Sequence, residues 1–238
     1  MKKIFIILPL LMVCLACSAG DRLRVTIFGD SYSTFEGYIT PDTNEPWYFR
    51  PDSPGKAKEN DVDAVEQTWW WQVLKRLDAE LVTNNSYSGS TIGYTGYVEK
   101  QGEGQANYKP RSFITRASNL GDPDLILVCG GTNDSWCGEL IGDFKFSDWQ
   151  EDDLFFFRPA MAKWCDTMKT LYPAKRILFI INSELKPDFV ESMHIILNRY
   201  KIEYLDLHDI DKQWGHPSQA GMKAFADQVV EYLQKTGK

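Results

Sequence analysis

The chain has 238 residues, of which 43% are hydrophobic, so it is long enough to bury one sizeable core as a single domain. A formal net charge of −7 argues against a nucleic-acid partner held through phosphate contacts. The positive charges are spread along the sequence without a basic block, which supports the same exclusion.

The first 19 residues have the layout of a bacterial export signal. Two lysines precede an apolar run over 4–15, and small residues follow as far as Ala19. Cleavage before Cys17 would leave a lipid-modified N-terminal cysteine, whereas cleavage after Ala19 would leave a soluble exported protein. We favour lipidation, and expect a protein that is periplasmic or anchored to a membrane only through that lipid.

Short apolar runs and helix-periodic segments alternate along the rest of the chain. Strands are expected over 25–28, 81–82, 125–129, 176–181 and 202–207. Helices are expected over 64–79, 112–119, 153–171, 187–200 and from Pro217 onward, with irregular segments over 40–63 and 135–152. Five strands separated by crossovers predict an α/β fold, a three-layer α/β/α sandwich on a flavodoxin-like, parallel five-stranded sheet.

Four residues that suit acyl transfer follow the ends of predicted strands. Ser31 offers a nucleophilic hydroxyl, Gly89 an unobstructed backbone N–H, Asn133 a side-chain amide and His216 a base that titrates near neutrality. The carboxyl ends of parallel strands meet at one edge of a sheet, so these residues are expected to converge.

The sequence blocks around these residues resemble those of the SGNH hydrolases, the GDSL-type esterases. The matching blocks are Gly29-Asp30-Ser31, Ser88-Gly89-Ser90-Thr91, Gly130-Gly131-Thr132-Asn133-Asp134 and His216-Pro217. The resemblance covers residues 22–236 and implies a carboxylic ester hydrolase that needs no cofactor. It also implies that Ser31 attacks the ester, that His216 takes its proton, and that Ser31, Gly89 and Asn133 form the oxyanion hole. Three scattered histidines specify no metal site.

The acid that would orient the histidine departs from the family pattern. The family places an aspartate three residues before the histidine, and Gln213 stands there in this chain. Either Asp211 orients the imidazole from five residues away, or Gln213 or a backbone carbonyl does so in a Ser-His dyad. We favour Asp211.

Two tryptophans lie close in sequence to the expected site. Trp136 follows Asn133 by three residues and Trp214 precedes His216 by two, so both are expected beside the nucleophile as platforms for a sugar ring. We therefore expect the substrate to be a small-molecule or glycan ester, an acylated and specifically acetylated carbohydrate. Three alternatives remain open: a lipid esterase or lysophospholipase, a non-catalytic carbohydrate-binding surface protein, and indoles that only wall the pocket.

Overall fold

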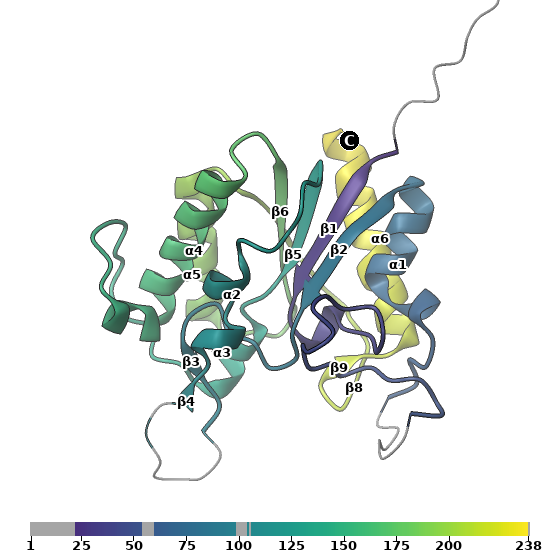
Figure 1. The fold of residues 1–238 in the computed structure, drawn as a ribbon, viewed down its shortest axis with the longest axis horizontal. Coiled ribbons are helices and arrows are strands. Elements are labelled where there is room, and N and C mark those ends of the chain that lie inside the picture. The colour runs from purple at the N-terminus through teal and green to yellow at the C-terminus, as the bar shows by residue number, and fades with distance from the viewer. Residues whose placement is uncertain (1–21, 54–59, 99–103, 105, 238) are drawn as a thin grey trace, which may run out of the picture.

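The computed structural model describes residues 22–53, 60–98, 104 and 106–237. At its centre is an all-parallel, five-stranded sheet with strand order β2-β1-β5-β6-β7 (Figure 1). The strands are β1 (Arg24–Gly29), β2 (Glu80–Ser86), β5 (Leu125–Cys129), β6 (Arg176–Ile181) and β7 (Glu203–Asp206). Numbered one to five along the chain, they have the order 2-1-3-4-5 of flavodoxin-like sheets. The predicted three-layer fold is confirmed.

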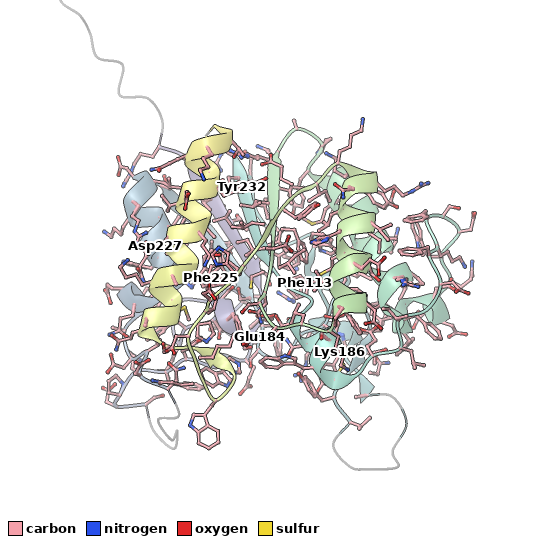
Figure 2. The ribbon with its side chains drawn as sticks, turned by 180° about the vertical axis from the view of Figure 1, so that it is seen from behind. Phe113, Glu184, Lys186, Phe225, Asp227 and Tyr232 are labelled. Carbon is pink, nitrogen blue, oxygen red and sulfur yellow. The ribbon has the colours of Figure 1, made fainter. Side chains whose placement is uncertain are left out.

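Helices cover both faces of this sheet and create two separate cores. One face carries α1 (Trp69–Leu77) and α6 (Gln219–Thr236), and the other carries α2 (Phe113–Arg116), α4 (Phe157–Leu171) and α5 (Pro187–Tyr200) (Figure 1). Figure 2 labels one aromatic residue of each core, Phe225 of α6 and Phe113 of α2. Every residue of β5 is buried, as expected for a central strand covered on both faces.

Short elements lie at the carboxyl ends of the strands. They are α3 (Thr132–Cys137), the two-stranded ribbons β3 (Thr95–Gly96) with β4 (Ala106–Asn107) and β8 (Lys212–Gln213) with β9 (His216–Pro217), and 3-10 turns over Ser31–Ser33, Val65–Gln67, Lys109–Arg111 and Glu151–Phe155. Gly29 of β1 pairs with Ser86 of β2 and with Cys129 of β5, so three strands end at one level. The segments that follow them therefore leave the sheet side by side.

The second strand is longer than its sequence pattern predicts, because polar side chains extend it. The apolar run covers only Leu81 and Val82, yet β2 continues to Ser86. Its buried Asn84 donates a hydrogen bond from Nδ2 to the backbone carbonyl of Ser33 at 2.9 Å, and accepts one from the Ser86 hydroxyl at 2.6 Å. A polar residue whose hydrogen bonds are made inside the protein can be buried without an apolar signal.

Two further expectations about elements are corrected. The segment 135–152 is not irregular throughout, because α3 continues to Cys137. The last helix does not begin at Pro217, which pairs in β9, but at Gln219, where the Ser218 side chain caps it by accepting the N–H of Gly221 at 3.2 Å.

The expected export signal and the lipidated Cys17 lie outside the described residues. Within 22–53, 60–98, 104 and 106–237, no helix combines the length and the apolar character that a membrane span requires.

Candidate active site

Ser31, whose hydroxyl is the predicted nucleophile, lies in a capped turn that follows β1. After Gly29, Asp30 caps the 3-10 turn by accepting the backbone N–H of Tyr32 on Oδ1 at 3.0 Å. A Cβ on Gly29 would lie 2.4 Å from Oγ of Ser33, so the turn closes only because this residue is glycine. Ser31 stands in this turn with 3% of its surface exposed.

The histidine reaches the hydroxyl from a tight hairpin. Between β8 and β9, Trp214 and Gly215 form a two-residue turn with φ values of 52° and 74°, the left-handed pair typical of type I′ hairpins. His216 is 8% exposed, and its Nε2 lies 2.9 Å from Oγ of Ser31. The phenol of Tyr32 donates to the carbonyl of Gly215 at 2.5 Å, which ties the hairpin to the Ser31 turn.

The expectation that Asp211 orients the imidazole is corrected. Nδ1 of His216 faces the backbone carbonyl of Trp214 at 3.1 Å. The Asp211 carboxylate instead accepts the hydroxyl of Ser218. The side chain of Gln213 is engaged elsewhere too, accepting the N–H of Asp61 at 2.9 Å. The arrangement is a Ser-His pair with a carbonyl in the third position, because the hairpin turn aims that carbonyl at the ring.

Aromatic rings surround the imidazole. Trp47 is stacked on His216 with ring centroids 3.6 Å apart and an interplanar angle of 6°. Tyr32, Trp136 and Tyr48 approach at centroid distances of 5.3, 6.0 and 6.2 Å. The sequence patterns did not identify Trp47 as part of the site. The aromatic residues in the long irregular segment 40–63 could have indicated it, because such segments are often functional.

This surrounding keeps the imidazole neutral. Burial lowers the pKa of His216 to about 4, against the opposing effect of the hydrogen bond with Trp214 and with help from the positive charge of Lys212. A neutral ring that donates from Nδ1 to the carbonyl presents its Nε2 lone pair to the hydroxyl of Ser31. Such a pair can remove the hydroxyl proton at neutral pH.

Two backbone N–H groups beside the hydroxyl are available to a ligand. Among the described residues, neither the N–H of Ser31 nor that of Gly89 has a hydrogen-bond acceptor. Gly89 has a φ of +73°, a backbone conformation that favours glycine. Crowding does not require a glycine here, since an added Cβ would meet only Nη1 of Arg111 at 3.7 Å.

Asn133 supplies a third donor from α3. Its Nδ2 donates one hydrogen bond to the carbonyl of Ser90 at 2.9 Å, and its Oδ1 accepts the phenol of Tyr97 at 3.1 Å. These contacts orient the amide and leave its second N–H free to bind a ligand oxygen. The positioning role of Tyr97 was missed, because 36 residues separate it from its partner.

A buried arginine joins the ends of β1 and β2 beneath these donors. Arg116 donates to the carbonyl of Gly29 at 3.2 Å, to Oγ of Ser90 at 3.0 Å and to Oδ1 of Asn85 at 3.0 Å. Burial lowers its pKa to about 9, and the charge of Asp30 opposes that shift. A buried cation bound to several carbonyls makes the two segments one rigid unit. It carried no sequence signal.

Three buried carboxyl groups support the same edge of the sheet. Burial raises the pKa of Asp30 to about 7 and that of Asp134 to about 6. Asp134 accepts a hydrogen bond from the backbone N–H of Ile92 at 2.9 Å. Glu139 is buried next to Asp134, and this burial together with the nearby carboxylate keeps the pKa of Glu139 well above its usual range. These contacts give Asp30 and Asp134 scaffold functions. Across the part of the chain that the structure describes, no three His, Cys, Asp or Glu side chains gather as metal ligands.

The two indoles expected beside the nucleophile differ in setting. Trp214 is 77% exposed at the tip of the hairpin, in a left-handed conformation that a tryptophan rarely adopts. Trp136 is 40% exposed and lies against the turn, 3.2 Å from the position of a Cβ on Gly215. The first indole projects outward, whereas the second forms part of the wall around His216.

Comparisons with known proteins agree with this geometry. A family model described as GDSL-like lipase/acylhydrolase matches residues 23–233. Crystal structures of GDSL-like lipases from Bacteroides ovatus and Bacteroides uniformis, both described as putative, are 47% and 50% identical, with TM-scores of 0.83 and 0.84. Each match covers 90% of this chain and 99% or 96% of the other.

More distant structures share the fold alone. An acetyl xylan esterase from Butyrivibrio proteoclasticus is 17% identical, with a TM-score of 0.57 over 90% of this chain and 64% of that one. A family two carbohydrate esterase from Clostridium thermocellum, solved in complex with cellohexaose, is 16% identical, with a TM-score of 0.53 and the same coverage. A search of curated proteins finds no match.

Proposed function

Because the chain belongs to the GDSL-like lipase/acylhydrolase family and is therefore a carboxylic ester hydrolase, we propose that it removes acetyl groups from carbohydrate esters. The observation that carries the proposed chemistry is the 2.9 Å contact between Nε2 of His216 and Oγ of Ser31, with the carbonyl of Trp214 at Nδ1.

In the proposed reaction, His216 takes the proton of Ser31 as Oγ bonds to the ester carbonyl carbon. The carbonyl oxygen becomes an oxyanion and accepts hydrogen bonds from the N–H groups of Ser31 and Gly89 and from the Asn133 amide. Each such donor contributes ~3–4 kcal/mol of transition-state stabilisation. His216 then protonates the leaving alcohol as the C–O bond breaks. A water deprotonated by His216 attacks the acyl carbon, the bond to Oγ of Ser31 breaks, the acyl group leaves as the carboxylic acid, and His216 returns the proton to Oγ.

Exposed aromatic rings on and against the hairpin turn that carries His216 support a carbohydrate substrate. An indole packs against the C–H face of a sugar while the hydroxyls stay hydrogen-bonded to water, and Trp214 is exposed for such a contact. Two structures of the same fold belong to an acetyl xylan esterase and to a carbohydrate esterase in complex with cellohexaose. The preformed Ser-His pair favours catalysis over carbohydrate binding alone.

Removal of the nucleophile tests the proposal. Ser31→Ala should lower turnover of p-nitrophenyl acetate by ~10⁴-fold while the thermal midpoint is kept. Ser118→Ala, which removes an exposed serine hydroxyl that bonds to the neighbouring Asn119, is the matched control. A Ser31→Ala enzyme with more than a few per cent of the wild-type rate would refute the assignment. A preference for long acyl chains over acetylated oligosaccharides would identify a lipid esterase instead.

We also propose that the protein is exported and anchored through Cys17. The lysine, apolar and small-residue pattern of residues 1–19 supports this placement. Intact-mass measurement of protein from the membrane fraction should find a diacyl or triacyl group on Cys17. A free N-terminus at Gly20 would contradict the anchor and leave secretion alone.

A further inference from the structure

Arg111 ends the 3-10 turn that precedes α2, and aromatic rings hold its side chain. Its guanidinium carbon lies 4.9 Å from the ring centroid of Tyr87 and 4.4 Å from that of Tyr108. The residue is half-buried, and so are both tyrosines. Stacking on aromatic faces restricts the motion of a guanidinium without using its N–H donors, so these donors stay available for hydrogen bonding.

Among the described residues, no acidic side chain pairs with this guanidinium. Within the described ranges, Arg111 has neither an ion pair nor a side-chain hydrogen bond. Two other arginines differ: Arg176 pairs with Glu203 at 2.8 Å, and the buried Arg116 is bound to carbonyls and a hydroxyl. A half-buried cation that has no counter-ion among the described residues, in a chain of net charge −7, is a ready binding point for an anion.

The position of this cation relates it directly to the proposed catalytic site. Nη1 of Arg111 lies 3.7 Å from the point that a Cβ on Gly89 would occupy, beside one of the proposed oxyanion donors. The carbonyl of Arg111 accepts Nε of Arg116 at 2.8 Å, and Arg116 also binds the carbonyl of Gly29. The same buried arginine thus positions Arg111 and the strand end that carries the nucleophile.

We propose that Arg111 binds a carboxylate of the ester substrate, so that the enzyme acts on acetylated acidic sugars. The inference rests on the proposed esterase function and narrows its substrate class. A guanidinium presents two parallel N–H donors that match the two oxygens of a carboxylate. Because the protein as a whole repels anions, one fixed cation beside Gly89 would decide whether a charged ester binds productively.

The wild-type enzyme provides the first test through substrates that differ in one group. Acetate release is measured from an acetylated methyl glucuronoside and from the corresponding acetylated methyl glucoside. A second pair, the p-nitrophenyl monoester of succinate and p-nitrophenyl butyrate, moves the carboxylate to the acyl half. We expect the charged sugar ester to have a kcat/KM about tenfold or more above its neutral partner. A charge preference confined to the acyl pair would refute the acidic-sugar assignment.

Variants of Arg111 test whether the guanidinium is responsible. Arg111→Gln should lower the charged-to-neutral ratio of kcat/KM by about tenfold or more, mainly through KM, and Arg111→Lys should retain part of it. Arg199→Gln is the matched control, because Arg199 also stacks on an aromatic ring, Phe146, but is exposed on α5. This control should leave the ratio unchanged.

Several outcomes would overturn the inference. An equal loss on both substrates in Arg111→Gln would mean that the guanidinium supports the fold or the reaction itself. If that variant does not fold, competitive inhibition of the wild-type enzyme decides: glucuronate should bind more tightly than glucose, and equal binding refutes the proposal. Absence of turnover on every ester would refute the proposed function, whereas turnover of neutral acetyl esters without a charge preference would refute only the role of Arg111.

Discussion

The indole of Trp47 lies parallel to the imidazole of His216, with ring centroids 3.6 Å apart and an interplanar angle of 6°. The same residue is tied to the nucleophile turn, because its backbone N–H donates to Oγ1 of Thr34 at 2.9 Å and that hydroxyl donates to the backbone carbonyl of Ser31 at 2.8 Å. Trp47 is therefore linked to both members of the proposed dyad, to His216 by direct stacking and to Ser31 through Thr34. An aromatic face also stabilises the imidazolium that forms when His216 accepts the proton.

Loss of this ring should slow catalysis more than it weakens binding. Trp47→Leu should lower kcat for p-nitrophenyl acetate by about tenfold, because a stacked cation on an aromatic face is worth ~1–2 kcal/mol when desolvated. Trp47→Phe keeps a π-face and should lose less. Equal losses in both variants, together with equally lowered thermal midpoints, would show that the indole only fills space.

A carbonyl in place of an acid leads to a distinct prediction for Asp211. Its carboxylate binds the Ser218 hydroxyl, which also caps α6. Asp211→Asn should therefore change kcat by no more than a few-fold while it lowers stability by ~1 kcal/mol, because the hydrogen bond from Ser218 then goes to a neutral amide oxygen and no longer to a charged carboxylate. Steady-state kinetics and thermal unfolding measure the two effects. A ~10⁴-fold loss in kcat, the size expected when the imidazole is held in the wrong tautomer, would show that Asp211 is the orienting acid.

Burial of the imidazole predicts an unusual pH profile. The base is active only when neutral, and burial lowers the pKa of His216 from 6.5 to about 4. The free enzyme should therefore keep its kcat/KM as the pH falls from about 7 to about 5, and lose it around the lowered pKa. The measurement is kcat/KM against pH with an ester that has no ionising group. A midpoint near 6.5 would contradict the shift.

The two exposed indoles should respond differently to mutation. Trp214→Asn suits the left-handed turn, since asparagine tolerates positive φ, and removes only a projecting ring. It should raise KM for an acetylated oligosaccharide several-fold more than it raises KM for p-nitrophenyl acetate. Trp136→Ala removes one of the rings around His216 and should impair both substrates. A Trp214→Asn enzyme with unchanged oligosaccharide kinetics would remove the main residue-level support for a sugar platform.

Local sequence patterns determined the architecture and the four blocks of the site. The apolar run over 125–129 and the helix-periodic stretch over 187–200 coincide with β5 and α5. Burial of one face or both imposes such patterns on neighbouring residues, so they can be read without any knowledge of distant contacts. Because parallel strands end at one edge, Ser31 and His216 could be expected to meet although 185 residues separate them.

The tertiary structure alone decided how the imidazole is held. Trp47 lies 169 residues from His216, and no periodicity links an indole to the ring on which it stacks. The choice of the Trp214 carbonyl over the Asp211 carboxylate depended on two positive φ angles in one hairpin turn. Contacts of this kind depend on the directions in which separate loops leave the sheet, which no single stretch of sequence encodes.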